Sequence, residues 1–390
     1  GTDFADISAQ ELGRTAVREL LEITAIDPEL IDEVIIGNVA TPPDAANIAR
    51  VIAYLAGIPK EKLAYTVSRN CASGMESITS AYEKIIAGSA EIVIAGGAES
   101  MSNIPLLYKK ETANIFSDIM KMKKLSGKIM NFLRFRPRHF LDPVIGIKLG
   151  LTDATCGLIM GDTAEVVARE YGVSRKASDE FSVQSHLKAV KFAAKRREEI
   201  AAVPVPPAYK KVIESDNGAR ENISMESLAK LKPFFDRKSG TVTIGNSSQI
   251  TDGACALLLM KEERAKELGY EPLGYIRSFA YVGVEPKKMG IAPAFAMPKA
   301  LKKAGLKLSD IGLFEINEAF AALIIAVERQ LELGGAGKLN MDILNVNGGA
   351  IALGHPVGAT GSRLIITLLK EMKRRSVKFG LASLCIGGGQ

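Results

Sequence analysis

The segment from residue 64 to residue 95 constrains the fold of this chain most strongly. Residues 64–67 form a short apolar run typical of a strand, and a turn of small residues follows directly. From Met75 onward apolar residues recur at helical spacing as far as Gly88, and residues 91–95 (EIVIA) form a second apolar run. A strand, a helix and a strand in this order predict a βαβ unit and a largely parallel sheet.

The same alternation returns in the last third of the chain. The apolar runs at 311–316, 343–346 and 379–385 predict strands, and residues 318–331 and 362–372 predict helices. Both parts of the chain place an apolar strand before a turn that carries cysteine or glycine. We therefore predict an α/β fold that contains this layer twice.

The segment between these parts breaks the alternation. Residues 106–240 contain a basic stretch, a predicted long helix at 175–199 and a turn-rich stretch at 216–220. The alternation resumes at 241–244, followed by the apolar run 254–260. Because 390 residues exceed the usual size of one hydrophobic core, we predict two or three domains, one of them inserted here.

Positive charge is concentrated in residues 109–148. This segment has ten basic and three acidic residues, a net charge of +7, whereas the whole chain has +6. Apolar residues recur in it every three or four positions: Ile119, Met122, Leu125, Ile129 and Leu133. An amphipathic helix with a basic face suits a membrane surface or a partner protein, although Gly127 weakens the helix prediction. A solvated lid helix and a nucleic-acid-binding arm are the alternatives, the latter because phenylalanines lie among the charges.

Two residues are candidates for nucleophilic chemistry. Cys71 lies where a predicted strand gives way to a helix, and a helix N-terminus favours the thiolate. His355 lies in a glycine-rich loop, GGAIALGHPVGATG, from which a histidine can act as base to a thiol. The structural alternatives are a cysteine packed in the core and a loop histidine that faces water.

Two further residues follow predicted strands. Cys385 precedes three glycines whose N–H groups could stabilise an oxyanion, although a cysteine at a strand end is more often a core residue. Asn317 precedes Glu-Ala-Phe at the start of a predicted helix, where an N-cap is the default role. No element is decisive alone.

Taken together, these motifs resemble the thiolase family. NCASGMES around Cys71, NEAFA from Asn317, the loop of His355 and SLCIGGGQ around Cys385 occur in the family's order and wording. GNSSQITDGA (245–254) and LAKLKPFF extend the resemblance over essentially the whole chain. The chain is most similar to 3-ketoacyl-CoA thiolases of the trifunctional-protein β-subunit kind. Those proteins tend to have histidine where this chain has Asn317.

The resemblance implies a fold and a domain division. The expected fold is the thiolase fold, a duplicated five-layer αβαβα arrangement with an inserted loop domain. Residues 1–105 and 246–269 would form the N-terminal half and residues 270–390 the C-terminal half. Residues 106–245 would form the inserted loop domain, with CoA contacts and the basic segment.

The resemblance also implies thiolytic cleavage of 3-ketoacyl-CoA by a second CoA. Cys71 would be the nucleophile, His355 its base and Cys385 the second acid and base. Asn317 would hold a water in one oxyanion site, and the N–H groups of Cys71 and Gly387 would form the other. A condensing ketoacyl synthase is disfavoured because such enzymes lack the late cysteine.

Substrate and partners are likewise implied by the resemblance. Arg220, Ser248 and Met160 match CoA-contacting or pocket positions, and CoA is a substrate, with no bound cofactor or metal expected. Ile159 replaces a histidine common in short-chain enzymes, which is compatible with longer acyl chains. We expect a homodimer or homotetramer, with a hydratase/dehydrogenase α-subunit as a candidate partner and no nucleic acid.

The role in the cell follows only as an expectation. Fatty-acid β-oxidation is favoured, while a biosynthetic acetoacetyl-CoA thiolase and a non-catalytic acyl-CoA- or lipid-binding protein are the alternatives. The four cysteines are scattered, without a CxxC pair, as is typical of a reducing compartment. The expected location is the bacterial cytoplasm, or the mitochondrion in a eukaryote. Family members have further strands at both ends, so we expect this sequence to omit terminal residues.

Overall fold

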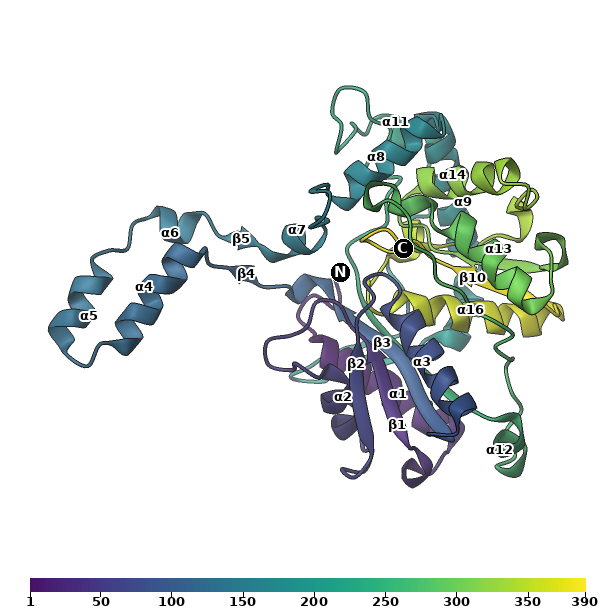
Figure 1. The fold of residues 1–390 in the computed structure, drawn as a ribbon, viewed down its shortest axis with the longest axis horizontal. Coiled ribbons are helices and arrows are strands. Elements are labelled where there is room, and N and C mark those ends of the chain that lie inside the picture. The colour runs from purple at the N-terminus through teal and green to yellow at the C-terminus, as the bar shows by residue number, and fades with distance from the viewer. The chain divides into compact units, whose positions relative to one another are not determined.

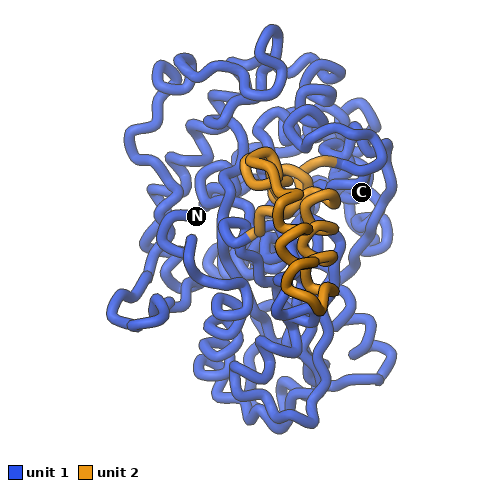
Figure 2. Tube along the Cα trace, turned by 90° about the vertical axis from the view of Figure 1, so that its left-hand side faces the viewer, with its two compact units in different colours: residues 1–103, 153–390 blue, residues 104–152 orange.

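A computed structural model describes all 390 residues, which form two compact units (Figure 2). Unit 1 comprises Gly1–Asn103 and Asp153–Gln390, and unit 2 comprises Ile104–Thr152. Unit 2 consists of the basic part of the segment that is predicted to form an inserted domain. The assignment of residues 106–245 to a single domain stays a prediction.

The larger sheet of unit 1 has the strand order β2-β1-β3-β8 (Figure 1). Its strands are β1 (Glu33–Gly37), β2 (Leu63–Val67), β3 (Ile92–Ser100) and β8 (Asp252–Met260). β1 pairs in parallel with both β2 and β3, and β8 is antiparallel to β3. The predicted βαβ unit is therefore confirmed as β2, α3 (Ser73–Ala87) and β3, with Gly88 ending the helix at a φ of 74°.

Alternate residues of the strands pack on opposite faces of this sheet. Val34 and Ile36 belong to a core cluster with residues of α1 (Ala9–Thr24) and α2 (Ile48–Ala56). Ile35, between them, packs with residues of α3. This two-residue periodicity places a helical layer on each face of the sheet.

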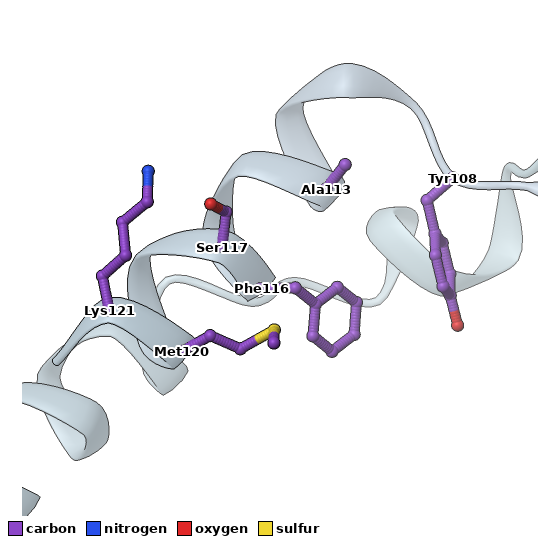
Figure 3. A pocket seen from close by; sticks show the side chains of 6 residues that line it. All are labelled: Tyr108, Ala113, Phe116, Ser117, Met120 and Lys121. Atoms are coloured by element: carbon purple, nitrogen blue, oxygen red, sulfur yellow. The ribbon is translucent and has the colours of Figure 1, made fainter.

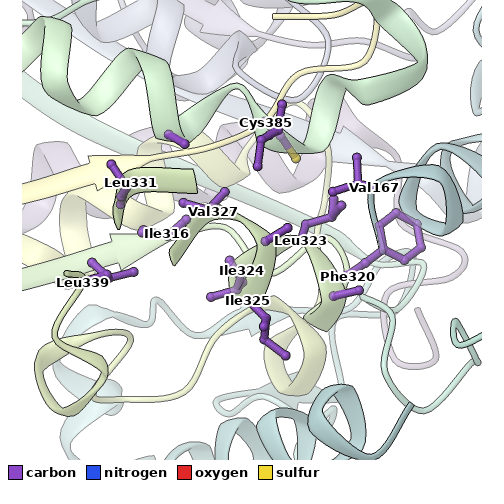
Figure 4. Packing of buried hydrophobic residues seen from close by; sticks show 14 of the residues in the cluster. Val167, Ile316, Phe320, Leu323, Ile324, Ile325, Val327, Leu331, Leu339 and Cys385 are labelled. Atoms are coloured by element: carbon purple, nitrogen blue, oxygen red, sulfur yellow. The ribbon is translucent and has the colours of Figure 1, made fainter. Parts of the chain in front are cut away.

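The second sheet pairs β9 (Leu313–Ile316) and β10 (Gly380–Ser383) in parallel. Leu313 packs with Leu368 of α16, and Phe314 packs in the cluster around α14, part of which Figure 4 shows. The helices on these two faces are α16 (Thr360–Arg375), α13 (Pro293–Ala304) and α14 (Ala321–Leu333). Because α16 also packs against α3, the order of layers is helices, sheet, helices, sheet, helices. The predicted α/β fold with two such sheets is confirmed.

Three sequence predictions for unit 1 were wrong in detail. Residues 343–346 form no strand, because Leu344 makes only one bridge, to Phe314. The helix predicted from 318 begins at Ala321, and Phe320, not Asn317, is its N-cap residue. The helix predicted at 175–199 ends at Lys191.

Unit 1 has further α-helices and two short strands outside these layers. They are α8 (Met160–Glu170), α9 (Arg175–Lys191), α10 (Ala193–Arg196), α11 (Met225–Ala229), α12 (Glu262–Glu267), α15 (Ala350–Leu353), β6 (Val203–Pro204) and β7 (Val212–Ile213).

Unit 2 is a small helical hairpin. Its elements are β4 (Leu106–Leu107), α4 (Lys110–Lys121), α5 (Leu125–Phe132), α6 (Arg138–Leu141), β5 (Val144–Ile145) and α7 (Gly146–Gly150). The single amphipathic helix predicted through 119–133 is wrong, because extended backbone at Met122 and Lys124 separates α4 from α5. The turn lets the ring of Phe116 meet that of Phe135 at 4.8 Å between centroids. No helix of the chain is both long and apolar enough to cross a bilayer.

Candidate active site

Cys71 lies between the end of β2 and the start of α3, and its side chain is half-buried. Burial raises the pKa of the Cys71 thiol, whereas a hydrogen bond from the N–H of Gly387 lowers it by less. The expected preference for thiolate at this helix start is therefore not found. A thiol that rests in the protonated form needs a base before it can attack.

The chain around Gly387 is attached to the Cys71 turn by a second hydrogen bond. The amide Nδ2 of Asn70 donates to the Gly387 carbonyl at 2.6 Å, across 317 positions of sequence. Asn70 has a φ of 44°, a left-handed conformation that asparagine tolerates better than most residues. These two hydrogen bonds hold Cys71 and Gly387 next to each other.

Cys385 and Met160 lie beside the same contact. Cys385 is buried two residues before Gly387, and burial, with a smaller contribution from Cys71 when that residue is a thiolate, raises the pKa of Cys385. Figure 4 shows Cys385 at the edge of the core cluster around α14. A Cβ atom at Gly387 would lie 3.2 Å from the sulfur of Met160, the first residue of α8. The two cysteines, Gly387 and Met160 thus form one group.

His355 lies in the loop between α15 and α16, and its hydrogen bonds show which ring nitrogen carries no hydrogen. The hydroxyl of Thr360 donates to the carbonyl of Pro356 at 2.9 Å, which uses its only hydrogen. The same oxygen lies 2.6 Å from Nδ1 of His355, so it accepts the Nδ1–H. Nε2 therefore carries the lone pair of the neutral ring.

Asn317 faces that lone pair. Its Nδ2 lies 3.4 Å from Nε2 of His355, and its backbone N–H donates to the carbonyl of Ser383 at 2.9 Å. Burial, with a smaller contribution from the charge of Arg363, lowers the pKa of His355 to about 4. The imidazole is therefore neutral at pH 7 and can accept a proton at Nε2. Oδ1 of Asn317 is buried and has no partner in the protein, so it is open to a donor such as water.

The two other predicted CoA contacts lie along adjoining loops. The N–H of Ser248 donates to the carbonyl of Ala319 at 2.9 Å, which places the Ser248 turn against the segment that carries Asn317. Arg220 is exposed, and its backbone N–H donates to Nδ1 of His186 at 3.1 Å. The side chain of Gln249, next to Ser248, donates to the carbonyls of both Gly218 and Ile351. These bonds join both loops to the start of the His355 loop.

The structure therefore arranges the candidate residues in two contacting pairs, and the segment at the end of β10 connects the two pairs. Cys71 contacts Gly387, and Asn317 contacts His355 and the end of β10, from which Cys385 follows. A protonated thiol, a neutral imidazole, a second thiol and N–H donors are the groups that acyl transfer through a thioester requires. No group of three His, Cys, Asp or Glu side chains is placed to hold a metal ion.

Three residues with supporting contacts were not singled out from the sequence. Asn70 fastens Gly387, Thr360 sets the tautomer of His355, and the hydroxyl of Thr251 accepts the backbone N–H of His355 at 3.2 Å. Asn70 and Thr360 lie inside the motifs that were recognised, so closer reading of those motifs could have identified them. Thr251 also lies inside a recognised motif, GNSSQITDGA, but 104 positions before His355, so the motif alone does not show that the two residues meet.

Comparison with known proteins agrees over the full length of the chain. Residues 1–263 match the thiolase N-terminal domain and residues 270–390 the thiolase C-terminal domain. The chain is 42% identical to a 3-ketoacyl-CoA thiolase of Serratia proteamaculans, over 100% of this chain and 91% of that protein. It is 43% identical to a probable acetyl-CoA acyltransferase of Staphylococcus aureus, over 100% of this chain and 93% of that protein.

Solved structures give the same result. Human mitochondrial 3-ketoacyl-CoA thiolase in complex with CoA superposes with a TM-score of 0.85 at 36% identity, covering 99% of this chain and 91% of that one. Bacillus anthracis acetyl-CoA acetyltransferase superposes with a TM-score of 0.87 at 37% identity, covering 99% and 92%. The predicted thiolase fold is confirmed. The chain belongs to the thiolase family of acyltransferases.

Proposed function

We propose that the chain is a 3-ketoacyl-CoA thiolase of fatty-acid breakdown. It cleaves a 3-ketoacyl-CoA with a second CoA, giving acetyl-CoA and an acyl-CoA shortened by two carbons. The observation that carries the proposal is the contact between Cys71 and the N–H of Gly387, with Cys385 two residues away. The CoA-bound human relative supports CoA as substrate.

In the first half-reaction Nε2 of His355 takes the proton of the Cys71 thiol. The sulfur then attacks the 3-keto carbon, and the bond between carbons 2 and 3 breaks. The electron pair stays on carbon 2, and the acetyl-CoA enolate takes a proton from Cys385. Asn317, next to His355, holds the water of one oxyanion site.

In the second half-reaction a new CoA thiol gives its proton to the Cys385 thiolate, because His355 still holds the proton that it took from Cys71. Its sulfur attacks the thioester carbonyl on Cys71, whose oxygen receives hydrogen bonds from the N–H groups of Cys71 and Gly387. The tetrahedral intermediate collapses, the shortened acyl-CoA leaves, and the Cys71 thiolate regains its proton. Two steps with a covalent intermediate replace one more difficult step.

CoA is held, in this proposal, by Arg220, Ser248 and Met160. Arg220 provides a charged guanidinium for phosphate oxygens. Met160, beside Gly387, lines the path to Cys71. Ile159, the residue before α8, gives the acyl site an apolar surface that suits longer chains.

Thiolysis of a 3-ketoacyl-CoA series from C4 to C16 tests the proposal. We expect turnover that rises beyond C4, with acyl transfer to Cys71 detectable as a mass increase. Cys71→Ala should abolish both, while Cys156→Ala, which changes a cysteine outside the site, should retain them. Turnover of C4 alone would favour a biosynthetic acetoacetyl-CoA thiolase. Binding of acyl-CoA without any turnover would favour a non-catalytic acyl-CoA-binding protein.

We further propose that unit 2 docks on an anionic membrane surface. Fifteen large apolar side chains of unit 2 are exposed, half of the thirty in the chain, although unit 2 spans only Ile104–Thr152. Met120 is 83% exposed and Met130 68% exposed. Figure 3 shows Met120 and Phe116 beside Tyr108 at the surface of α4. An exposed apolar surface of this density is typical of a docking site.

The charge around these side chains favours lipid over protein as the occupant. All ten basic residues of 109–148 are exposed, and they lie on both sides of the turn between α4 and α5. Anionic headgroups attract such a segment by about 1 kcal/mol per basic residue close to the membrane. Apolar side chains flanked by basic ones are the pattern of peripheral membrane helices.

Co-sedimentation of the full chain with vesicles tests the docking. We expect binding to vesicles with 30 mol% phosphatidylglycerol and little to phosphatidylcholine alone, and the difference should shrink in high salt. Reversing Lys121, Lys123, Lys124 and Lys128 to Glu should weaken binding at least tenfold. Reversing the exposed Lys60, Lys176, Lys302 and Lys338 should not. Equal binding by both variants would contradict the proposal, and unit-2-dependent capture of a purified hydratase/dehydrogenase subunit without lipid would assign the surface to protein.

Assembly and location complete the proposal. Homodimers or homotetramers are proposed by resemblance, with a hydratase/dehydrogenase α-subunit as a candidate partner, and size-exclusion chromatography with light scattering checks the mass. The proposed location is the bacterial cytoplasm, or the mitochondrion in a eukaryote, because the acyl-CoA substrates of the proposed reaction are intracellular.

A further inference from the structure

A buried carboxylate joins the two parts of the chain that carry Cys71 and His355. Glu99, near the end of β3, is 0% exposed. Its Oε2 accepts the backbone N–H of Gly358 at 3.0 Å, and Gly358 lies three residues after His355 in the same loop. The carboxyl group of Glu99 makes no hydrogen bond to Cys71 or to the ring of His355.

The remaining hydrogen bonds of Glu99 come from the turn that follows β1. Oε2 also accepts the N–H of Val39 at 3.0 Å, and Oε1 accepts the N–H of Ala40 at 3.1 Å and Nδ2 of Asn38 at 3.0 Å. All four contacting groups are hydrogen-bond donors. An ionised carboxylate accepts a hydrogen bond from each of them, whereas a protonated carboxyl group has an O–H that faces donors. Burial raises the pKa of Glu99 to about 7, against the effect of these donors. The four donors therefore offset only part of the free-energy cost of burying the charge.

The His355 loop lies in direct contact with the backbone around Glu99. A Cβ atom at Gly97, on the same strand, would lie 2.1 Å from the carbonyl oxygen of Gly358. A Cβ at Gly358 would lie 2.9 Å from Oε2 of Glu99 and from Cα of Asn38. The loop is thus pressed against β3 at a contact that only glycines permit.

We propose that Glu99 is a positioning residue that holds the His355 loop against β3 and so sets the place of Nε2 relative to Cys71. It touches neither substrate nor reacting atoms. It acts through Gly358, while Thr360, two residues farther on, orients the ring. The inference rests on the proposed function, since it assigns Glu99 to the reaction of Cys71 and His355.

Glu99→Gln tests the inference because it keeps the shape and removes the charge. The amide NH2 must face two N–H donors, so two of the four hydrogen bonds are lost. We expect kcat to fall ten- to a hundredfold, since a displacement of about 1 Å can cost a hundredfold in rate. KM for the 3-ketoacyl-CoA should change less than twofold. Glu99→Asp, which keeps the charge on a shorter side chain, should recover part of kcat.

Glu165→Gln is the matched control. Glu165 is likewise a buried carboxylate that accepts backbone N–H groups, those of Thr241 and Val242, but it does not contact the His355 loop. The Glu165→Gln substitution should lower the free energy of unfolding by about as much as Glu99→Gln does. It should leave kcat within twofold of the wild-type value. Equal loss of kcat in both variants would show general loosening and overturn the inference, as would wild-type kcat in Glu99→Gln.

Amide hydrogen exchange separates this inference from the proposed function. Exchange at Gly358 should accelerate at least tenfold in Glu99→Gln, while exchange within β3 at Val93 and Ala95 stays unchanged. This measurement needs no turnover, so it remains decisive for the attachment of the loop if the wild-type chain cleaves no 3-ketoacyl-CoA. Unchanged exchange at Gly358 would overturn the inference even if the enzyme is active.

Discussion

The amide of Asn317 and the bare nitrogen of His355 give the site a donor and a base side by side. In Asn317→Ala the oxyanion loses the water that the amide holds, while the CoA contacts remain. We expect kcat to fall about a hundredfold, or roughly 3 kcal/mol in the barrier, with little change in KM. Asn131→Ala, which removes an amide of unit 2 that bonds to Gly127, serves as the control in steady-state thiolysis assays. An equal fall in both variants would rule out a specific role for Asn317.

Acid should destabilise the protein through its buried histidines. Burial lowers the pKa of both His355 and His186 to about 4 from 6.5, so the folded state binds these protons less readily than the unfolded state. The free energy of unfolding that each neutral histidine contributes is fully present above about pH 6.5 and is lost as the pH falls towards 4. We expect the wild type to lose about 2 kcal/mol at pH 5 through His355 alone.

Urea unfolding between pH 5 and pH 8 measures this effect. His355→Asn should show a shallower decline of unfolding free energy than the wild type, and the double variant with His186→Asn a shallower one still. Parallel curves for all three proteins would contradict the prediction.

The sequence motifs identify the candidate reacting residues, but they do not reveal the electrostatics of those residues. Cys71 stands out by its motif, but its raised pKa results from burial by residues elsewhere in the chain. Thr251 contacts His355 only because the fold brings two distant loops together. Local sequence does not contain that information.

At the scale of elements, glycines govern how α3, β3 and the His355 loop meet. Gly97→Ala should destabilise the protein by about 1 to 3 kcal/mol, because the new methyl would overlap the carbonyl of Gly358. Gly150→Ala, at the end of α7, meets nothing within 4 Å and should be neutral or stabilising by up to about 1 kcal/mol. Guanidinium unfolding of both variants provides the comparison, and equal stability of the two would contradict it.

Elements with strong local patterns were predicted well and those that depend on partners were not. The apolar runs of β2 and β3 identify those strands, and β3, which lies between β1 and β8, is buried along its whole length. The run at 343–346 has a similar composition but only one bridge. The interruption of the helix in unit 2, at Met122 and Lys124, accompanies the contact between Phe116 and Phe135, which helical spacing does not encode.

For the whole molecule, CoA should act as a stabilising ligand. Saturation at a hundred times Kd should raise the unfolding free energy by about 2.7 kcal/mol. Arg220→Ala and Ser248→Ala should reduce the gain by weakening CoA binding, whereas the exposed Arg237→Ala should not. Thermal unfolding with and without CoA measures the shift, and an unchanged shift in the first two variants would remove them from the CoA site.

The hydrogen bond from Asn70 to Gly387 spans nearly the entire chain. Pairings of such long sequence separation form late in folding, because the loop between them must first be closed. A chain in which Asn70 and Gly387 have not yet paired therefore lacks the N–H group of Gly387 beside Cys71. We expect refolding to restore turnover only after secondary structure has formed, and an activity assay during refolding would measure when this pairing forms.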